Sequence, residues 1–119
     1  MKKIVLVDDY ESFLIVLKEF IEINYENVEC ETFSKPLEAL KYIESEKNVD
    51  LLITDYEMPK MNGFELASRV LSKFPNLKII ISSGHDKFTL DSVCEGYGLK
   101  GKVKLSDKGD LAFLKELIS

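Results

Sequence analysis

The chain of 119 residues lacks a long hydrophobic segment. A membrane-spanning helix needs about 20 consecutive apolar residues, and no run in this sequence approaches that length. At the amino terminus only residues 4–7 are apolar before Asp8, whereas a signal peptide needs an apolar stretch of about 7–15 residues. We therefore expect a soluble cytoplasmic protein with no export signal and no membrane contact.

An excess of positive charge is also missing. The sequence has 16 basic and 21 acidic residues, which gives a formal net charge of −5. A field of this sign repels polyanions such as nucleic acids and anionic lipids. Direct binding of nucleic acid is therefore not expected.

Cysteine is scarce, because Cys30 and Cys94 are the only two in the chain. They are far apart in sequence, and neither has a histidine or a second thiol nearby at metal-ligand spacing. We expect both to be reduced packing residues and not a disulfide or a metal site.

Several short apolar runs are present instead, and they predict β-strands. The runs at 4–7, 51–53 and 79–81 are continuous, which is typical of strands buried on both faces. Residues 28–33 alternate apolar and acidic side chains, which favours an edge strand. A fifth strand is expected around residues 100–105.

The segments between these runs have the spacing of amphipathic helices. Four expected helices carry the apolar stripes Phe13/Leu17/Phe20/Ile21, Leu37/Leu40/Ile43, Phe64/Ala67/Val70/Leu71 and Leu111/Leu114/Ile118, and a less regular helix is expected at 86–97. Ser34 is the expected cap of the second helix, with Pro36 in its first turn, and Ser106 or Asp107 the expected cap of the last. Five strand-then-helix units predict one α/β domain, residues 1–119, with a parallel sheet covered by helices on both faces.

Polar residues end the apolar runs, and in such a sheet ligands bind beyond the carboxyl ends of the strands. The residues are Asp8, Asp9, Asp55, Ser82, Ser83 and Lys104. Acids at strand ends are often only solvated loop residues, but three that converge would repel one another unless a cation joined them. Mg²⁺ prefers such carboxylates together with phosphate oxygens. A hydroxyl and an ammonium group beside the ion suit a transferred phosphoryl group.

Four motifs carry a resemblance to a known family. They are residues 5–9 (VLVDD), 52–63 (LITDYEMPKMNG), 79–85 (IIISSGH) and the pair Val103-Lys104. Over essentially its whole length the chain resembles the receiver domain of bacterial two-component response regulators. The resemblance implies a flavodoxin-like (βα)5 three-layer sandwich, with a five-stranded parallel sheet of order 2-1-3-4-5.

The resemblance also implies roles for the site residues. Asp55 is similar to the phosphoacceptor, which accepts a phosphoryl group from a phosphohistidine on a sensor histidine kinase or phosphotransfer protein. Implied Mg²⁺ ligands are Asp55, Asp9 directly, Asp8 through water, and the carbonyl of Glu57. Ser83 and Lys104 would contact the phosphoryl group. The domain would then switch conformation to control a downstream partner or output domain, and it would support only its own phosphorylation and dephosphorylation.

The sequence departs from the family pattern around the proposed lysine. Leu105 follows Lys104 where the family usually has proline, which makes Lys102 a rival for the same role. Gly101 stands three residues before Lys104, where the family often has an aromatic switch residue. Tyr97 is a substitute for that aromatic or an ordinary packing residue.

Other positions near the site keep two interpretations. His85 either influences the access of water to the acyl-phosphate or is an exposed loop residue. Glu57 is a further candidate modulator. Met58 and Met61 either contact a kinase or pack within their loop.

Two alternative functions follow from the same sequence. A pseudo-receiver would bind partners without being phosphorylated, although the three aspartates argue against it. A flavin-binding electron carrier of the same fold would need a Ser/Thr/Gly-rich phosphate cradle after the first strand. The acidic Asp8 and Asp9 stand there and would repel the cofactor phosphate.

Overall fold

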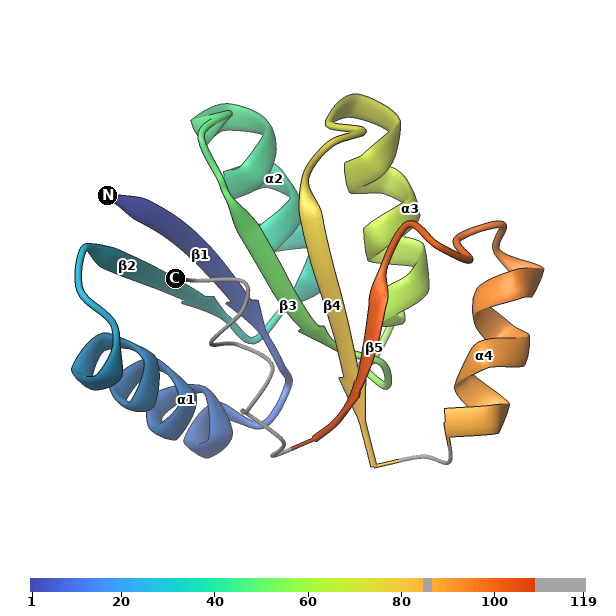
Figure 1. Ribbon diagram of the computed structural model, residues 1–119, viewed down its shortest axis with the longest axis horizontal. Helices are drawn as coiled ribbons and strands as arrows, with labels where there is room; N and C mark the ends of the chain where they lie inside the picture. The colour runs from blue at the N-terminus through green and yellow to red at the C-terminus, as the bar shows by residue number, and fades with distance from the viewer. Residues whose placement is uncertain (85–86, 109–119) are drawn as a thin grey trace.

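The structure, a computed structural model, describes residues 1–84 and 87–108. Its centre is a five-stranded sheet in the order β2-β1-β3-β4-β5, in which all neighbouring strands are parallel (Figure 1). The strands are β1 (Lys2–Val7), β2 (Val28–Phe33), β3 (Leu51–Asp55), β4 (Lys78–Ser83) and β5 (Lys104–Asp107). The predicted parallel sheet of order 2-1-3-4-5 is thereby confirmed, and β2 is an edge strand as predicted.

Within the described residues, helices cover both faces of the sheet. They are α1 (Glu11–Asn24), α2 (Pro36–Glu46), α3 (Gly63–Lys73) and α4 (Lys87–Gly96). Figure 1 shows α1 on one side of the sheet and α2 and α3 on the other, with α4 beside β5. The expected helix with Leu111, Leu114 and Ile118 lies outside the described residues.

The apolar core has one cluster on each face of the sheet. Alternate residues of the central strands enter opposite clusters, so that Leu52 and Ile79 face α2 and α3 while Ile53 and Ile80 face α1. Both clusters contain fully buried side chains. The continuous apolar runs therefore form strands buried on both faces, as the sequence predicts.

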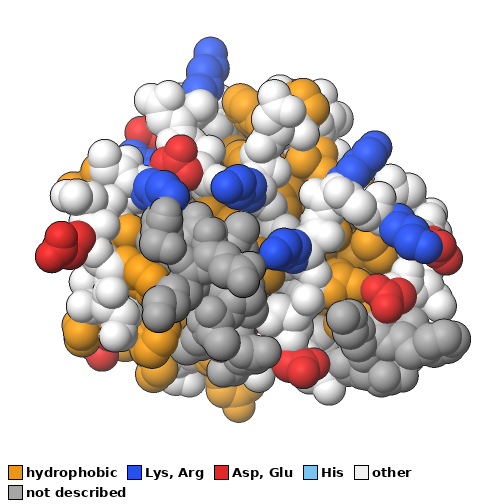
Figure 2. Space-filling view, viewed as in Figure 1, with side chains coloured by type: hydrophobic (Ala, Val, Ile, Leu, Met, Phe, Trp, Pro, Cys, Tyr) orange, Lys and Arg blue, Asp and Glu red, His pale blue; other side chains and the backbone are white. Residues whose placement is uncertain are grey.

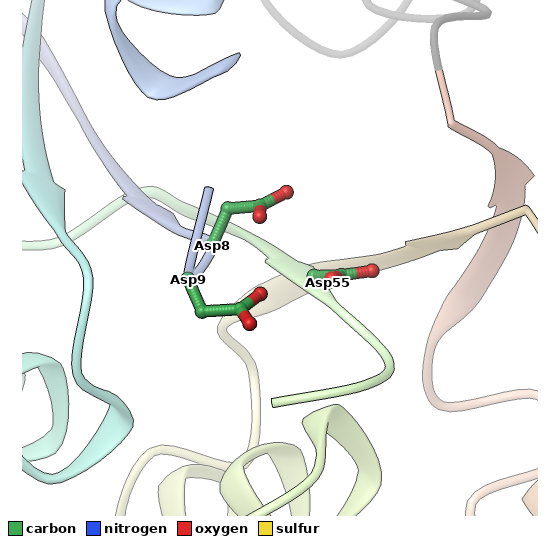
Figure 3. Close-up of side chains that lie close together, drawn as sticks. All are labelled: Asp8, Asp9 and Asp55. Carbon is green, nitrogen blue, oxygen red and sulfur yellow. The ribbon is translucent and has the colours of Figure 1, made fainter. Parts of the chain in front are cut away.

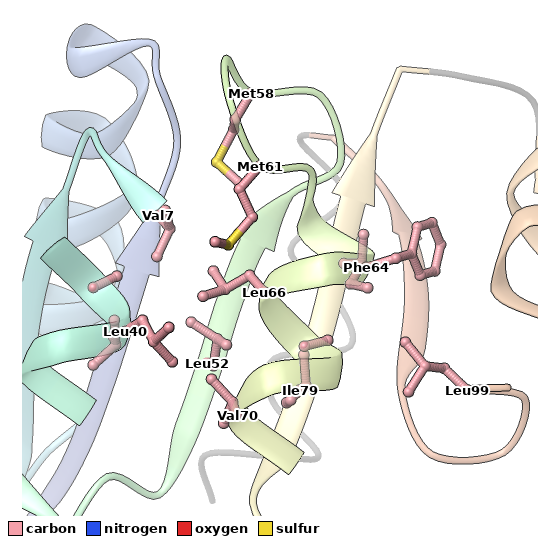
Figure 4. Close-up of a cluster of buried hydrophobic side chains, with 14 of the residues drawn as sticks. Val7, Leu40, Leu52, Met58, Met61, Phe64, Leu66, Val70, Ile79 and Leu99 are labelled. Carbon is pink, nitrogen blue, oxygen red and sulfur yellow. The ribbon is translucent and has the colours of Figure 1, made fainter. Parts of the chain in front are cut away.

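Met58 and Met61 belong to the cluster under α2 and α3, where Figure 4 shows Met61 between Met58 and Leu66. Both side chains are buried, with exposed fractions of 9% and 4%. The Met58 sulfur also accepts a hydrogen bond from the Thr54 hydroxyl at 3.8 Å. Their burial in the core supports the packing interpretation of these methionines. Contact of either side chain with a kinase stays an untested alternative.

The two cysteines are free and buried, as predicted. Burial raises the pKa of the Cys30 thiol to about 12. This thiol is therefore protonated at neutral pH and behaves as a small apolar side chain.

The beginning of α2 differs in part from the prediction. Pro36 occupies the first turn as expected, but the cap residue is Lys35 and it makes no side-chain cap hydrogen bond. Ser34 lies one residue too early to cap the helix, so that expectation was wrong. The cap of α3 is more complete, because the Asn62 side chain accepts a hydrogen bond from the Glu65 backbone N–H at 2.9 Å.

The last strand begins later than predicted. Residues 97–103 form turns, in which Gly98 and Gly101 have left-handed φ angles of 70° and 79°. β5 therefore runs from Lys104 to Asp107 and not over 100–105. Ser106 and Asp107 are residues of β5. The helix that one of them was expected to cap lies outside the described residues.

The outer surface has no dominant patch of one charge on the face seen in Figure 2. There the described Lys and Arg side chains stand apart and are interspersed with Asp and Glu. Among the described residues, no helix is both long and apolar enough to cross a membrane.

Candidate metal and phosphoryl site

Three aspartates meet at the carboxyl ends of β1 and β3, which are neighbours in the sheet. One carboxylate oxygen from each of Asp8, Asp9 and Asp55 lies within 4.8 Å of the others. Asp8 and Asp55 are buried and Asp9 is exposed. Figure 3 shows the three side chains together where the two strands end. The sequence-predicted cluster is therefore assembled.

Backbone hydrogen bonds fix the first acidic pair. The Asp8 N–H donates to the Phe33 carbonyl at 3.2 Å, which extends the pairing of β1 with β2 by one residue. The Asp8 carboxylate accepts the Tyr10 N–H at 2.9 Å, just before α1 begins. The turn between β1 and α1 is thus held against the carboxylate of Asp8.

The segment after Asp55 is equally constrained. The Tyr56 N–H donates to the Ser82 carbonyl at 2.9 Å, and the Gly63 N–H donates to the Tyr56 carbonyl at 2.8 Å. A Cβ atom at Gly63 would lie only 2.4 Å from the Asp55 carbonyl oxygen. Glycine is therefore required at position 63 because the start of α3 returns directly onto the end of β3.

The cation of the site is Lys108, a residue that the sequence analysis missed. Its ammonium lies 2.9 Å from Asp8 Oδ2 and 3.6 Å from Asp55 Oδ2. Its backbone N–H donates to the Ser83 carbonyl at 3.0 Å, directly after β5 ends. Lys108 thus projects from the end of β5 toward both buried acids.

Lys104 and Lys102 do not occupy this position, so both assignments were wrong. Lys104 is the first residue of β5, pairs in register with Ile80 and is exposed. Lys102 lies in the preceding turn and is also exposed. β5 contains one large apolar residue, Leu105, so hydrophobicity did not mark its end. The turns at Gly98 and Gly101 were the sequence signal that β5 begins later than residue 100.

The corrected register changes which residues carry the departures from the family pattern. Gly109 now stands directly after the lysine, where the family usually has proline. Leu105 stands three residues before Lys108, where the family often has an aromatic. Both departures therefore persist.

Burial and charge act together on Asp55. Burial, followed by the nearby charge of Asp8, raises the pKa of the Asp55 carboxyl to about 6, against the lowering effects of Lys108 and the Tyr56 N–H. For Lys108, burial opposes the charged form, but its close contact with the Asp8 carboxylate and the charge of Asp55 raise its pKa overall. The cluster is thus an acidic site that a cation stabilises.

The residues present fit a magnesium ion. Three carboxylates converge, and the buried Asp8 Oδ2 makes no well-directed hydrogen bond within the described part of the chain, although Lys108 faces it as an ion pair. Oxygen donors of this kind and number suit a hard divalent cation. An ion that contacts Asp8 would satisfy that oxygen.

The remaining predicted site residues lie around this cluster. Ser83 is buried at the end of β4, and Glu57 lines a shallow depression of about 450 Å³ together with Asp9. These positions fit the roles predicted for them, and the roles themselves stay predictions. His85 lies outside the described residues.

Tyr97 connects the end of α4 to the loop that follows Asp55. Its ring stacks on Phe64 with centroids 5.7 Å apart, and its hydroxyl accepts a hydrogen bond from Asn62 Nδ2 at 3.1 Å. Phe64 in turn meets the Tyr56 ring edge-on at 5.3 Å. Tyr97 therefore packs against the start of α3 and the loop that follows Asp55. Its role as a switch stays a prediction.

Comparison with known proteins places these features in one family. The family model described as "response regulator receiver domain" matches residues 4–104. The sequence is 33% identical to the two-component response regulator ARR13 of Arabidopsis thaliana, over 67% of this chain and 14% of that protein. This chain thus spans about one seventh of the relative's length.

Solved structures agree in fold and sequence. The response regulator TrrA of Thermotoga maritima, in complex with Mg²⁺ and BeF, matches with a TM-score of 0.78 and 31% identity, over 98% of this chain and 95% of that one. A CheY-like receiver domain protein of Methanospirillum hungatei matches with a TM-score of 0.81 and 28% identity, over 98% and 92% of the two chains.

Proposed function

The chain belongs to the response regulator receiver domain family, and on that premise we propose that it accepts a phosphoryl group on Asp55 in a reaction that needs Mg²⁺. Receiver domains of response regulators take phosphoryl groups from kinases or phosphotransfer proteins. The expected donor is therefore the phosphohistidine of a sensor histidine kinase or of a phosphotransfer protein. The observation that carries the proposal is the convergence of three carboxylates and the Lys108 ammonium at one edge of the sheet.

The proposed step is a phosphoryl transfer between two nucleophiles. A carboxylate oxygen of Asp55 attacks the phosphorus, the bond from phosphorus to the histidine nitrogen breaks, and its electron pair stays on the imidazole. The product is an acyl-phosphate on Asp55. Against burial and the charge of Asp8, the Lys108 ammonium lowers the pKa of the Asp55 carboxyl. A bound cation would act in the same direction and favour the ionised carboxylate that a nucleophile requires.

The other residues hold and neutralise the group being transferred. Asp8, Asp9, Asp55 and the carbonyl of Glu57 would hold Mg²⁺, which neutralises charge on the phosphoryl oxygens. Lys108 supplies a second positive charge, and the Ser83 hydroxyl supplies a donor from the neighbouring strand.

Mass spectrometry of the intact protein tests the proposal. After incubation with Mg²⁺ and a small acyl-phosphate donor, the wild type should gain one phosphoryl group and Asp55→Ala none. Asp91→Ala is the matched control, because Asp91 is an exposed acid on α4. Equal labelling of Asp55→Ala and wild type would exclude Asp55. A wild type that takes no label under these conditions would favour the pseudo-receiver alternative.

The wider setting is proposed on the same basis. We infer that residues 1–119 form one receiver domain in the cytoplasm, that the domain contacts neither nucleic acid nor membrane directly, and that its phosphorylation controls a partner or an output domain. The formal charge of −5 supports the exclusion of polyanions. Because the chain spans 14% of ARR13, no output activity is carried over from that relative.

A further inference from the structure

Lys108 reaches Asp8 and Asp55 from the edge of the sheet that β5 forms. It follows the edge strand β5, whereas Asp55 ends β3 and Asp8 follows β1. Strands lie about 4.8 Å apart, so three spacings, roughly 14 Å, separate the strand of the lysine from that of Asp8. The side chain must therefore be extended to place its ammonium 2.9 Å from Asp8. Holding a lysine extended costs rotamer entropy of up to about 2 kcal/mol.

Two aromatic rings lie beside the extended lysine. The Lys108 ammonium is 4.9 Å from the centre of the Phe13 ring and 5.9 Å from the centre of the Tyr10 ring. Both distances fall within the roughly 6 Å range of a cation–π interaction. The start of α1 and the end of β5 both lie at the carboxyl edge of the sheet (Figure 1). The shallow depression of about 450 Å³ at this place is lined by Tyr10, Ser12, Phe13, Val16 and Lys108.

The same turn that fixes Asp8 also fixes the rings. The Tyr10 N–H donates to the Asp8 carboxylate at 2.9 Å, and the Phe13 N–H donates to the Tyr10 carbonyl at 3.0 Å. Phe13 is partly buried against the cluster under α1, whereas Tyr10 is 67% exposed. The Phe13 ring is therefore closer to the ammonium than the Tyr10 ring, and it is held more firmly because it packs against the core.

The rings differ from Asp8 in how they respond to a metal ion. Mg²⁺ and the Lys108 ammonium compete for the same carboxylate, so ion binding weakens the Asp8–Lys108 pair. An aromatic face attracts the ammonium without offering a ligand that Mg²⁺ prefers. The Phe13 ring can thus retain Lys108 beside the site after the ion pair has been weakened.

We propose that Phe13 is a positioning residue that holds the Lys108 ammonium toward the phosphoryl group, with Tyr10 as a weaker second contact. The inference rests on the proposed function, since it assigns Lys108 to the phosphoryl group. Phe13 touches neither the ion nor the phosphoryl group in this account and acts only through Lys108. Its substitution should therefore change the binding of a phosphoryl mimic and leave the binding of the ion unchanged.

Beryllofluoride, a mimic of the phosphoryl group, provides the test in combination with Mg²⁺. Two affinities are measured for each protein by amide chemical shifts: that for Mg²⁺ alone, and that for beryllofluoride at saturating Mg²⁺. Phe13→Leu removes the ring and keeps an apolar side chain, and it should weaken beryllofluoride binding roughly three- to fivefold. Its affinity for Mg²⁺ should stay within about twofold of wild type, since no metal ligand has changed.

Controls separate positioning from simple packing. Phe13→Tyr restores an aromatic face and should restore beryllofluoride affinity. Ile15→Leu changes an exposed side chain on the same helix and should have no effect. In a Lys108→Ala background, Phe13→Leu should add nothing, because the residue through which it acts is gone.

Three results would overturn the inference. They are an unchanged beryllofluoride affinity in Phe13→Leu, an equal loss in the Lys108→Ala background, or an equal weakening of Mg²⁺ binding. A wild type that binds Mg²⁺ but not beryllofluoride would instead contradict the proposed function, so the two failures are distinguishable. Urea unfolding of each variant confirms that the loss arises in folded protein.

Discussion

The acidic and the basic halves of the site rest on very different parts of the sheet. Asp8 directly follows β1 and Asp55 ends β3, two strands that have a hydrogen-bonded neighbour on each side and are buried on both faces. Lys108 follows β5, an edge strand of 4 residues whose side chains are half-buried or exposed. The acids are thus positioned by the sheet itself, whereas the lysine depends on what its side chain touches.

This difference separates two kinds of perturbation. Changes near the acids act on backbone packing and buried charge, so they should alter the free energy of unfolding. Changes to the residues that contact the lysine should alter mainly the response to a ligand.

Among the changes near the acids, Gly63→Ala should lower the free energy of unfolding most. Its new Cβ would lie 2.4 Å from the Asp55 carbonyl oxygen, which is backbone and cannot move aside without shifting β3. Overpacking of this kind costs about 3 kcal/mol, measured as the free energy of unfolding in urea. The matched control is Gly96→Ala in α4, where no described atom lies within 4 Å and stability should rise by about 0.5 kcal/mol. A Gly63→Ala protein as stable as wild type would contradict the close approach.

Asp9→Asn tests the electrostatic cost of the cluster. In chelator the mutant should be more stable than wild type, because two carboxylates about 5 Å apart repel by roughly 3 kcal/mol at an effective dielectric near 20 before screening. Mg²⁺ at about 100 times its dissociation constant should add roughly 2.7 kcal/mol to wild type and clearly less to the mutant.

Four urea melts, two proteins with chelator and with excess Mg²⁺, supply the comparison. Asp91→Asn on α4 serves as the control and should gain as much from Mg²⁺ as wild type does. If Asp9→Asn is less stable than wild type in chelator, or gains equally from Mg²⁺, Asp9 has no part in a strained metal site.

The stability of the metal-free protein should fall as pH rises through the titration of Asp55. The pKa of this carboxyl is about 6 in the folded state and near 4 in an unfolded chain. The folded state therefore binds more protons between about pH 4 and 6, and raising the pH removes stability across that window. Relative to Asp55→Asn, wild type should lose roughly 1–3 kcal/mol from pH 4 to pH 7. Parallel stability curves for the two proteins in chelator would show that Asp55 does not titrate in this way.

Tyr97→Phe should have the smallest effect. It removes the hydrogen bond from Asn62 and keeps the stacking on Phe64. Because Tyr97 is 38% exposed, water replaces much of that bond, and the cost should be about 0.5 kcal/mol. Amide chemical shifts should change at Asn62 and Glu65, which share the cap of α3. Shifts confined to α4 would mean that the two elements are not coupled.

The sequence predicted the acid half of the site because its elements carry strong hydrophobic signals. Continuous apolar runs lead to Asp8 and Asp55, so the strand ends and the meeting of three carboxylates could be anticipated. The sheet order was implied by the resemblance to receiver domains and not by the apolar runs. The motif at residues 52–63 added the loop that follows Asp55.

The basic half could not be placed by the same reasoning. β5 reads Lys-Leu-Ser-Asp, in which one apolar residue cannot fix a register. The predicted strand at 100–105 included Val103, although Val103 lies in the bend just before β5. The contacts of Lys108 with Phe13 and Tyr10 join residues almost a hundred positions apart, and such pairs become visible only when the chain is folded.

The central claim, that Lys108 is the cation of an aspartate site, is tested most directly by comparing Lys108→Ala with Lys104→Ala. The measurement is the change in amide chemical shifts when Mg²⁺ and beryllofluoride are added together. Lys104→Ala should respond as wild type does, because Lys104 is exposed at the start of β5. Lys108→Ala should lose most of the response, because the ammonium beside Asp8 and Asp55 is gone. A full response in Lys108→Ala, or a larger loss in Lys104→Ala, would contradict the account.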